Sequence, residues 1–424
     1  MPGDGTRTAT TNADPLPRCL DLTRLISRVG KGPDTGVDRV ERAYLMRLLT
    51  EPLPVFGLVR TPLGYILLDR NGMRQVAHRL SGAVAWGRVD LIGILSRKTP
   101  RMRRRAQADL RRLAIARCLT GRLHAMLRRR FPSGCHYINV GHSNLRYDVL
   151  AAWRNLKGGR IAVLVHDTIP LDYPQFQRPG TPELFMAKLR RVSAMADLVI
   201  CNSQVTRDDA QRWFREFGRK PDCVVAHLGV DIPQADLADL PSDVDLSKPY
   251  FLTIGTIEPR KNHALLLDVW EKIVAELPQS HAPHLIIVGK RGWANEPVFH
   301  RLDTSALMNR VIFERAGLKD NALAALLAGS SGLLCPSFAE GFGLPPVEAA
   351  ALGVPVICRR LPVYEEILGN IPVYLDSDDV YLWKQSIMRL TEAKAARQQR
   401  GNQAKAPTKT PNWDDHFNIV LKLT

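Results

Sequence analysis

Short apolar runs and amphipathic segments alternate along most of the chain. In the first half, apolar runs that favour β-strands lie at residues 19–25, 55–60, 65–69, 136–140, 161–166, 198–202 and 223–226. Between them, apolar residues follow a helical spacing at 38–49, 103–129, 182–195 and 204–217. This alternation predicts parallel sheets that are covered by helices on both faces.

The second half repeats the alternation after an interruption. Residues 229–249 contain several prolines and show no helical period, which is typical of a linker. Beyond it, strands are predicted at 250–255, 284–289, 311–313, 333–336, 354–358 and 373–375, and helices at 264–276, 320–328 and 345–352. We therefore predict an α/β protein of two Rossmann-like, doubly wound domains, 18–228 and 250–395, with a cleft at the carboxyl ends of both sheets. A polar tail, 1–17, is expected before them and a tail with a short amphipathic helix, 396–424, after them.

The composition excludes several classes of protein. The chain has 424 residues, of which 45% are hydrophobic and 24% charged, so it can bury a core and is not disordered throughout. No apolar run is long enough for a transmembrane helix, and the polar N-terminus does not resemble a secretory signal. The seven cysteines are scattered and form no CxxC pair, which favours a reducing, cytoplasmic compartment over a zinc or disulfide framework.

The positive charge is concentrated in one segment. The formal net charge is +17, and residues 97–130 hold thirteen Lys or Arg against a single acid, Asp109. If this segment forms one basic amphipathic helix, it can lie on an anionic membrane, which would place the protein at the inner face of the cytoplasmic membrane. The alternative is a helix that packs on the core with a solvated basic face. Nucleic acid is not expected as a partner, because the segment has no aromatic residues among its arginines on which bases could stack.

The most informative motif lies at residues 337–353, SFAEGFGLPPVEAAALG. Glu340 and Glu348 are separated by seven residues, and Gly341 and Gly343 form the turn between a strand and a helix. Such a turn offers free backbone N–H groups and the positive end of a helix, which together bind a phosphate or diphosphate. A carboxylate one turn inside the helix can accept hydrogen bonds from a sugar diol.

A second motif, GTIEPRKN at 255–262, joins the first strand of the second domain to its first helix. Arg260 and Lys261 then lie at a carboxyl end of that sheet and face the same cleft. Two cations at this place would neutralise a leaving diphosphate without a metal ion. Taken one by one, these charged residues are equally typical of a solvated surface or a helix start.

The order of these motifs, with HLIIVGKRGW between them, resembles the donor-binding half of glycosyltransferase family 4, whose members are retaining enzymes of the GT-B fold. The resemblance implies a nucleotide-diphosphate sugar as co-substrate, no metal and no other cofactor. It implies that the catalytic residues are His166, Glu340, Lys261 and Arg260. It implies donor-binding roles for Gly36, Gly255, Thr256, Gly341, Phe342, Gly343 and Glu348, and a contact of the base with backbone near 311–315.

The first half carries a looser resemblance. TGVDRV at 35–40 is similar to the family's N-terminal glycine loop, and IAVLVHDTIP at 161–170 to its strand that ends beside the reacting sugar. Asp38 can simply cap the following helix, and His166 can be an ordinary core histidine. On the acceptor side we expect Asp167, His142 and Asn144. The resemblance also implies that the C-terminal helix crosses back to the first domain.

The function expected from the sequence is hexosyl transfer, of mannosyl or glucosyl type, to a saccharide or lipid-linked saccharide in polysaccharide or lipopolysaccharide biosynthesis. Two alternatives stay open. One is a sugar-nucleotide isomerase or a phosphorylase on the same fold. The other is a non-catalytic protein that binds anions.

Overall fold

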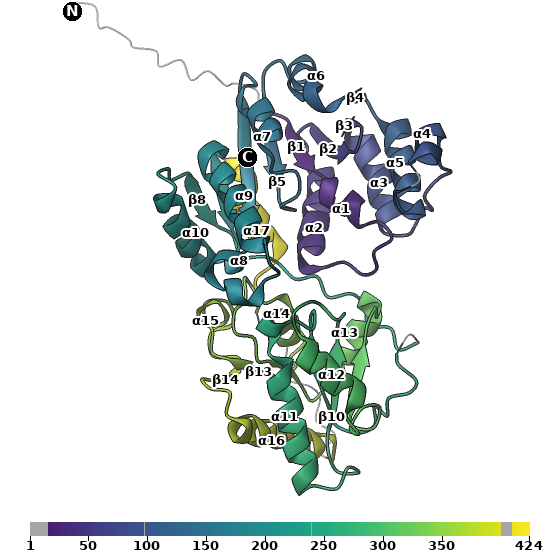
Figure 1. Ribbon diagram of the computed structural model, residues 1–424, viewed down its shortest axis with the longest axis vertical. Coiled ribbons are helices and arrows are strands. Elements are labelled where there is room, and N and C mark those ends of the chain that lie inside the picture. Colours follow the sequence, from purple (N-terminus) through teal and green to yellow (C-terminus); the bar gives the residue numbers. More distant parts are fainter. Residues whose placement is uncertain (1–15, 97, 239, 400–408) are drawn as a thin grey trace, which may run out of the picture.

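The computed structural model describes residues 16–96, 98–238, 240–399 and 409–424. These form two α/β domains, drawn one above the other in Figure 1. Most of the expected tail 1–17, and residues 400–408 of the expected tail 396–424, lie outside the described residues. Among the described residues, no helix combines the length and the apolar character that a membrane crossing requires.

The N-terminal domain is built on an eight-stranded sheet of order β4-β3-β2-β1-β5-β6-β7-β8. The pairs β2–β3 and β3–β4 are antiparallel, and the other pairs are parallel. The strands are β1 (Arg18–Asp21), β2 (Val55–Thr61), β3 (Gly64–Leu68), β4 (Ala116–Cys118), β5 (Cys135–Asn139), β6 (Gly159–Val165), β7 (Leu198–Cys201) and β8 (Asp222–Val225). The helices are α1 (Thr23–Arg28), α2 (Gly36–Thr50), α3 (Arg70–Leu80), α4 (Leu91–Leu95), α5 (Arg101–Leu113), η1 (Thr120–Arg122), α6 (Leu123–Arg130), α7 (Tyr147–Arg154), α8 (Ile169–Asp172), η2 (Pro174–Phe176), α9 (Thr181–Met195) and α10 (Gln204–Glu216).

The C-terminal domain has a six-stranded, all-parallel sheet of order β11-β10-β9-β12-β13-β14. Its strands are β9 (Tyr250–Ile254), β10 (His284–Val288), β11 (Ile312–Arg315), β12 (Gly332–Cys335), β13 (Val356–Arg359) and β14 (Val373–Leu375). Its helices are η3 (Pro259–Lys261), α11 (His263–Glu276), α12 (Glu296–Thr304), α13 (Asp320–Ala328), α14 (Leu344–Ala351), α15 (Pro362–Leu368) and α16 (Val380–Gln399), and α17 (Trp413–Leu423) ends the chain.

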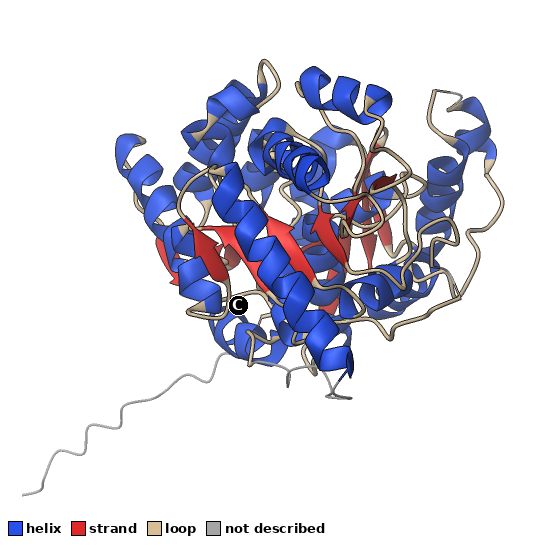
Figure 2. Ribbon diagram, turned by 90° about the horizontal axis from the view of Figure 1, so that it is seen from below, coloured by secondary structure: helices blue, strands red, loops and turns tan. Residues whose placement is uncertain are grey.

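Helices enclose the strands, as Figure 2 shows, and this explains the apolar runs of the sequence. Every residue of β10 and of β12 is buried, because both faces of the sheet are covered. The predicted pair of α/β domains is therefore confirmed. One predicted strand is shorter than expected: β1 ends at Asp21, and residues of the predicted strand 19–25 continue into α1.

The single basic helix predicted over 103–129 is wrong. The segment divides into α5, the short edge strand β4, η1 and α6. Its apolar positions Leu110, Leu123 and Met126 are buried in the core, so they do not form a free apolar face. Arg105 and Arg111 are also engaged inside the fold, by the backbone carbonyl of Gly87 and by Asp90. The packing alternative describes α5 and α6 better than a helix lying on a membrane.

Helix α17 lies against the N-terminal domain, although it follows the C-terminal one. Tyr44 of α2 is hydrogen-bonded to Nε2 of His416 at 2.8 Å, and the Tyr44 and Phe417 rings pack edge to face. Hydrogen bonds also connect the two domains directly. Glu366 of α15 accepts hydrogen bonds from the first two N–H groups of α10, those of Gln204 and Val205.

Candidate active site

Two cations lie where β9 ends and the chain turns into η3. Gly255 adopts φ 143°, and a Cβ at this position would lie 3.1 Å from Cε of Lys261. The glycine therefore supplies both the turn and the room in which the Lys261 side chain lies. η3 places Arg260 beside Lys261, so both reach the loop after β12.

Glu340 is held between these two cations. Its Oε1 is 2.6 Å from Lys261 Nζ, and its Oε2 is 3.0 Å from Arg260 Nη1. Arg260 also contacts Glu258 at 2.6 Å. Burial opposes the ionisation of Glu340, but Lys261 and Arg260 outweigh it and lower its pKa to about 2. The cluster is thus a fixed set of ionised groups, with its positive members at the carboxyl end of the sheet.

The N-terminal domain meets this cluster at the end of β6. A Cβ on Gly341 would lie 2.6 Å from the carbonyl oxygen of His166 and 2.9 Å from Cβ of Asp167. Thr206 of α10 donates to the carbonyl oxygen of Gly341 at 3.3 Å. The loop after β12 and the loop after β6 are therefore in direct contact, which brings the predicted residues of both domains to one place.

His166 and His142 are both neutral at physiological pH. Nε2 of His166 is 2.7 Å from the carbonyl oxygen of Val140, and burial lowers the pKa of His166 to about 4. Because a carbonyl only accepts, Nε2 carries the proton and Nδ1 is the basic nitrogen. The His142 ring lies 5.0 Å from the His166 ring, and its Nε2 is 2.8 Å from the carbonyl oxygen of Leu164. Burial likewise lowers the pKa of His142.

Asp167 is half-buried, and its Oδ1 accepts a hydrogen bond from the N–H of Ile169 at 3.1 Å. Burial raises its pKa to about 6, although Arg260 counteracts this. The unfolded chain loses this proton near pH 3.9, so the folded state binds more protons between these two values. The contribution of Asp167 to stability therefore falls as the pH rises through this window.

Replacing Asp167 with asparagine is expected to remove that dependence, because the amide keeps a hydrogen-bond acceptor and carries no charge. Between pH 4 and pH 7, the free energy of unfolding of the wild type should fall by about 2 kcal/mol relative to that of the variant. Urea unfolding of both proteins at the two pH values measures it. A difference that does not vary with pH contradicts the raised pKa.

Glu348 lies on α14, whose N-cap Gly343 has φ 87°. The carboxylate is buried, and it forms an ion pair with Arg39 of α2, in the other domain. Burial raises the pKa of Glu348, which Arg39 counteracts. Arg39 also lies 3.4 Å from the carbonyl oxygen of Asp231 in the linker. One arginine thus connects both domains and the linker at the carboxylate predicted to hold a ribose.

Gly36 begins α2 and faces the start of α14. A Cβ on Gly36 would lie 3.2 Å from Leu344, and Thr35 caps the helix in a capping box with Asp38. The N-cap is therefore Thr35, and Asp38 contributes to the capping as the third residue of the helix, not as the cap itself. Asp38 is buried and also binds Arg24 and Arg28. The N-termini of α2 and α14 approach each other. Pro345 and Pro346 carry no N–H, so among the first three residues of α14 only Leu344 can offer one to a ligand.

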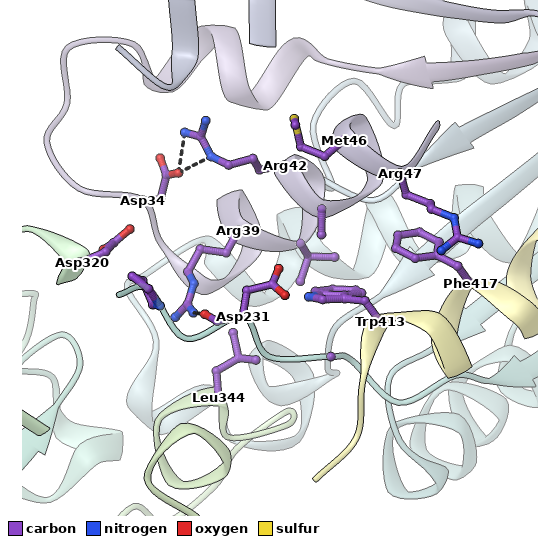
Figure 3. Close-up of a pocket in the computed structure, with 14 residues that line it drawn as sticks. Asp34, Arg39, Arg42, Met46, Arg47, Asp231, Asp320, Leu344, Trp413 and Phe417 are labelled. Atoms are coloured by element: carbon purple, nitrogen blue, oxygen red, sulfur yellow. Dashed lines mark hydrogen bonds and ion pairs between the residues drawn. The ribbon is translucent and has the colours of Figure 1, made fainter. Parts of the chain in front are cut away.

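A cavity of about 330 Å³ opens beside Arg39, between α2, the linker and α17. Figure 3 shows Asp34 and Asp320 at one end, Trp413 with Phe417 at the other, and Arg39 and Leu344 between them. A smaller hollow next to it is lined by Glu348 and shares Arg39 and Asp320 with the larger cavity. Arg39 therefore borders both hollows.

Two predicted residues do not present their side chains to this site. Asn144 is buried and donates to Asp21 at 2.7 Å, which corrects its assignment to the acceptor side. The Phe342 ring is buried in the core, so only its backbone can face a donor. The Thr256 methyl group lies against Gly292, and the donor-binding role of Thr256 stays a prediction.

Sequence reasoning missed other residues of the site. Lys188 of α9 is half-buried, and burial together with Arg191 and Arg24 lowers its pKa. It acts electrostatically on His142, one of the residues predicted on the acceptor side. In the sequence it is one more cation of an amphipathic helix, which gives no signal. Among the described residues, no three His, Cys, Asp or Glu side chains are grouped as metal ligands.

Comparisons with known proteins agree with this geometry. The family model "Glycosyl transferases group 1" matches residues 240–406, and "Glycosyltransferase Family 4" matches residues 71–234. The serotype-specific mannosyltransferase WbdA of Escherichia coli is 33% identical over 234 residues, which are 52% of this chain and 28% of that protein. The O-antigen chain mannosyltransferase B of Escherichia coli is 30% identical over 166 residues, 39% of this chain and 43% of that protein. The chain thus spans less than half the length of these curated relatives.

Two solved structures share the fold over nearly their whole length. A sucrose-phosphate synthase from Thermosynechococcus elongatus has a TM-score of 0.59 and 14% identity, covering 96% of this chain and 98% of that one. HepE from Anabaena, in complex with UDP-glucose, has a TM-score of 0.58 and 14% identity, covering 96% and 99%. These similarities confirm the GT-B fold. The two family models, which match residues 71–234 and 240–406, show that the chain belongs to glycosyltransferase family 4, group 1.

Proposed function

We propose that the protein is a metal-independent, retaining hexosyltransferase that uses a nucleotide-diphosphate sugar. The observation that carries the proposal is the cluster of Arg260, Lys261 and Glu340, which faces the His166–Asp167 loop of the other domain. Negative charge builds up on the diphosphate as the glycosidic bond to the sugar breaks. Fixed cations at that point stabilise the transition state more than the ground state.

The carboxylate of Glu340 has a positioning role in this proposal. Both of its oxygens are already engaged by cations, and its low pKa keeps it ionised. Such a group orients Lys261 and Arg260 and does not act as a general acid near neutral pH. His166 is neutral, and we assign it to a hydrogen bond with the sugar or the acceptor beside the anomeric carbon.

We propose mannose as the transferred sugar and a saccharide, or a lipid-linked saccharide, as the acceptor. The support comes from relatives whose names describe mannosyltransferases, two of them of O-antigen chains. Polysaccharide or lipopolysaccharide biosynthesis is then the process. These names do not favour the alternatives of an isomerase, a phosphorylase or a non-catalytic binder.

We also propose that the protein works in the cytoplasm at an anionic membrane surface. The support is the basic segment 97–130, in which Arg101, Arg117, Arg122, Arg128 and Arg129 are exposed. Each cation near such a surface adds about 1 kcal/mol of attraction. The attraction is electrostatic, so binding to anionic vesicles should weaken as salt is added.

The transferase proposal is tested with a panel of nucleotide-diphosphate mannoses and glucoses and saccharide acceptors, in the presence of EDTA. We expect turnover of a mannose donor that EDTA does not change, and a product whose anomeric configuration, determined by NMR, equals that of the donor. Activity that disappears with EDTA and returns with Mg²⁺ would contradict the metal-independent mechanism. An inverted product would contradict retention.

A further inference from the structure

The short helix α4 displays apolar side chains to solvent. Four of its five residues are Leu or Ile, and all four are exposed, with Leu91 at 79% and Leu95 at 82%. The remaining residue, Gly93 in the middle of the helix, is buried. An exposed cluster of large aliphatic side chains on a rigid element marks an interaction site more than scattered single residues do.

The helix is fixed to the body of the domain. Asp90 caps α4 by accepting from the N–H of Gly93 at 2.8 Å, and Arg111 of α5 holds Asp90 through two contacts of 2.6 Å. A Cβ on Gly93 would lie 2.4 Å from Val89, so the glycine lets the helix lie close to the preceding chain. The four exposed residues therefore lie on a helix that these contacts hold in place.

A groove continues this apolar surface. A hollow of about 340 Å³ lies between Ile92 of α4, the β2–β3 hairpin and the edge strand β4. Leu63 of the hairpin and Leu119 after β4 line it and are 53% and 68% exposed. Arg111 and Arg117 border the same hollow. We call α4 together with this groove the α4 surface. Figure 1 shows α4 at the outer edge of the N-terminal domain, and the sheet order places β4 at the edge of its sheet.

Cations surround the α4 surface, and the nearby acids are neutralised. Arg88, Lys98 and Arg101 flank α4 in the chain and are exposed. Within the described residues of 86–130, the acids are Asp90 and Asp109, and both are paired with arginines. Exposed aliphatic side chains flanked by exposed cations match the acyl region and the headgroups of an anionic bilayer.

We propose that the α4 surface inserts Leu91, Ile94 and Leu95 into an anionic phospholipid bilayer, while the surrounding cations bind its headgroups. This inference rests on the proposed membrane association and names the element that anchors it. A second copy of the chain fits less well, because a symmetric contact would bring the same cations of both copies together.

The test is sedimentation with vesicles of phosphatidylcholine containing phosphatidylglycerol, and with vesicles of phosphatidylcholine alone. Leu91→Glu/Leu95→Glu is compared with Leu184→Glu/Leu237→Glu, which makes the same change of charge at residues 73% and 72% exposed. We expect the α4 variant to bind anionic vesicles at least about tenfold more weakly than this control. Donor turnover in solution is measured in parallel and is expected to be equal in both.

Each other outcome has a distinct meaning. If both variants bind equally and salt releases both, the membrane association holds as an electrostatic effect and insertion of α4 is refuted. If the wild type binds neither kind of vesicle, the proposed membrane association itself fails, whatever the donor assay shows. A dimer of the wild type in gel filtration that the α4 variant loses and the control variant keeps, without vesicle binding by the wild type, would overturn the inference. The α4 surface would then bind a second copy of the chain.

Discussion

Replacing Lys261 with alanine is expected to lower kcat for sugar transfer by about 10²–10³-fold, with a smaller rise in the donor KM. Lys261 lies over Gly255 and is aimed at the loop after β12, where its Nζ is 2.6 Å from Glu340. Its charge is thus held in place before any substrate binds. Such a preorganised cation acts mainly on charge that develops in the transition state, so its loss appears in kcat more than in KM.

The control is Lys272→Ala on α11, because Lys272 is 55% exposed and pairs only with a neighbouring glutamate on its own helix. Steady-state kinetics of both variants, with a thermal unfolding curve for each, separate catalysis from stability. The Lys261 variant leaves Glu340 with Arg260 as its remaining ion-pair partner, so some loss of stability is expected as well. A kcat equal to that of the control variant would mean that the diphosphate does not bind at this cluster.

The sequence was sufficient for the fold because its continuous apolar runs and its helical spacing were clear where burial is complete. β9, β10 and β12 are apolar runs covered on both faces, and their predicted ranges agree with the structure to within one or two residues. The segment 103–129 failed for a physical reason. Residues spaced three and four apart also fit a helix, a short strand and a second helix in succession. Gly121 was the available sign of a break, since glycine weakens a helix.

The candidate site likewise contains residues whose positions the sequence predicts and residues whose contacts it does not. Arg260, Lys261 and Glu340 come from two local motifs that each lie at a strand end, so topology alone brings them to one edge of the sheet. The contact of Arg39 with Glu348 depends on how the two domains meet, which no spacing in the sequence encodes. Asn144 shows the opposite error, because a polar residue after a strand can serve a buried carboxylate as well as a substrate.

Replacing Glu348 with alanine is expected to weaken binding of the nucleotide-diphosphate donor by about 5- to 150-fold, or about 1–3 kcal/mol. The loss arises because the ribose hydroxyls, once buried against α14, would have no acceptor. Arg39→Ala is expected to change affinity in the other direction, by up to about fivefold. In the structure this arginine already occupies the Glu348 carboxylate, and a partly exposed ion pair is worth about 1 kcal/mol.

A double-mutant cycle with these two variants tests whether the arginine and the ribose compete. If they do, Arg39→Ala tightens donor binding in the wild type and has no effect in the Glu348→Ala background, because no carboxylate is left to release. Isothermal titration with the nucleoside diphosphate measures all four proteins. Arg154→Ala, which breaks a 2.6 Å surface ion pair with Asp197, controls for a general loss of positive charge. If Arg39→Ala instead weakens binding as much as Glu348→Ala, Arg39 binds the donor itself. The ion pair would then mark an arginine and a carboxylate that hold the donor together across the two domains.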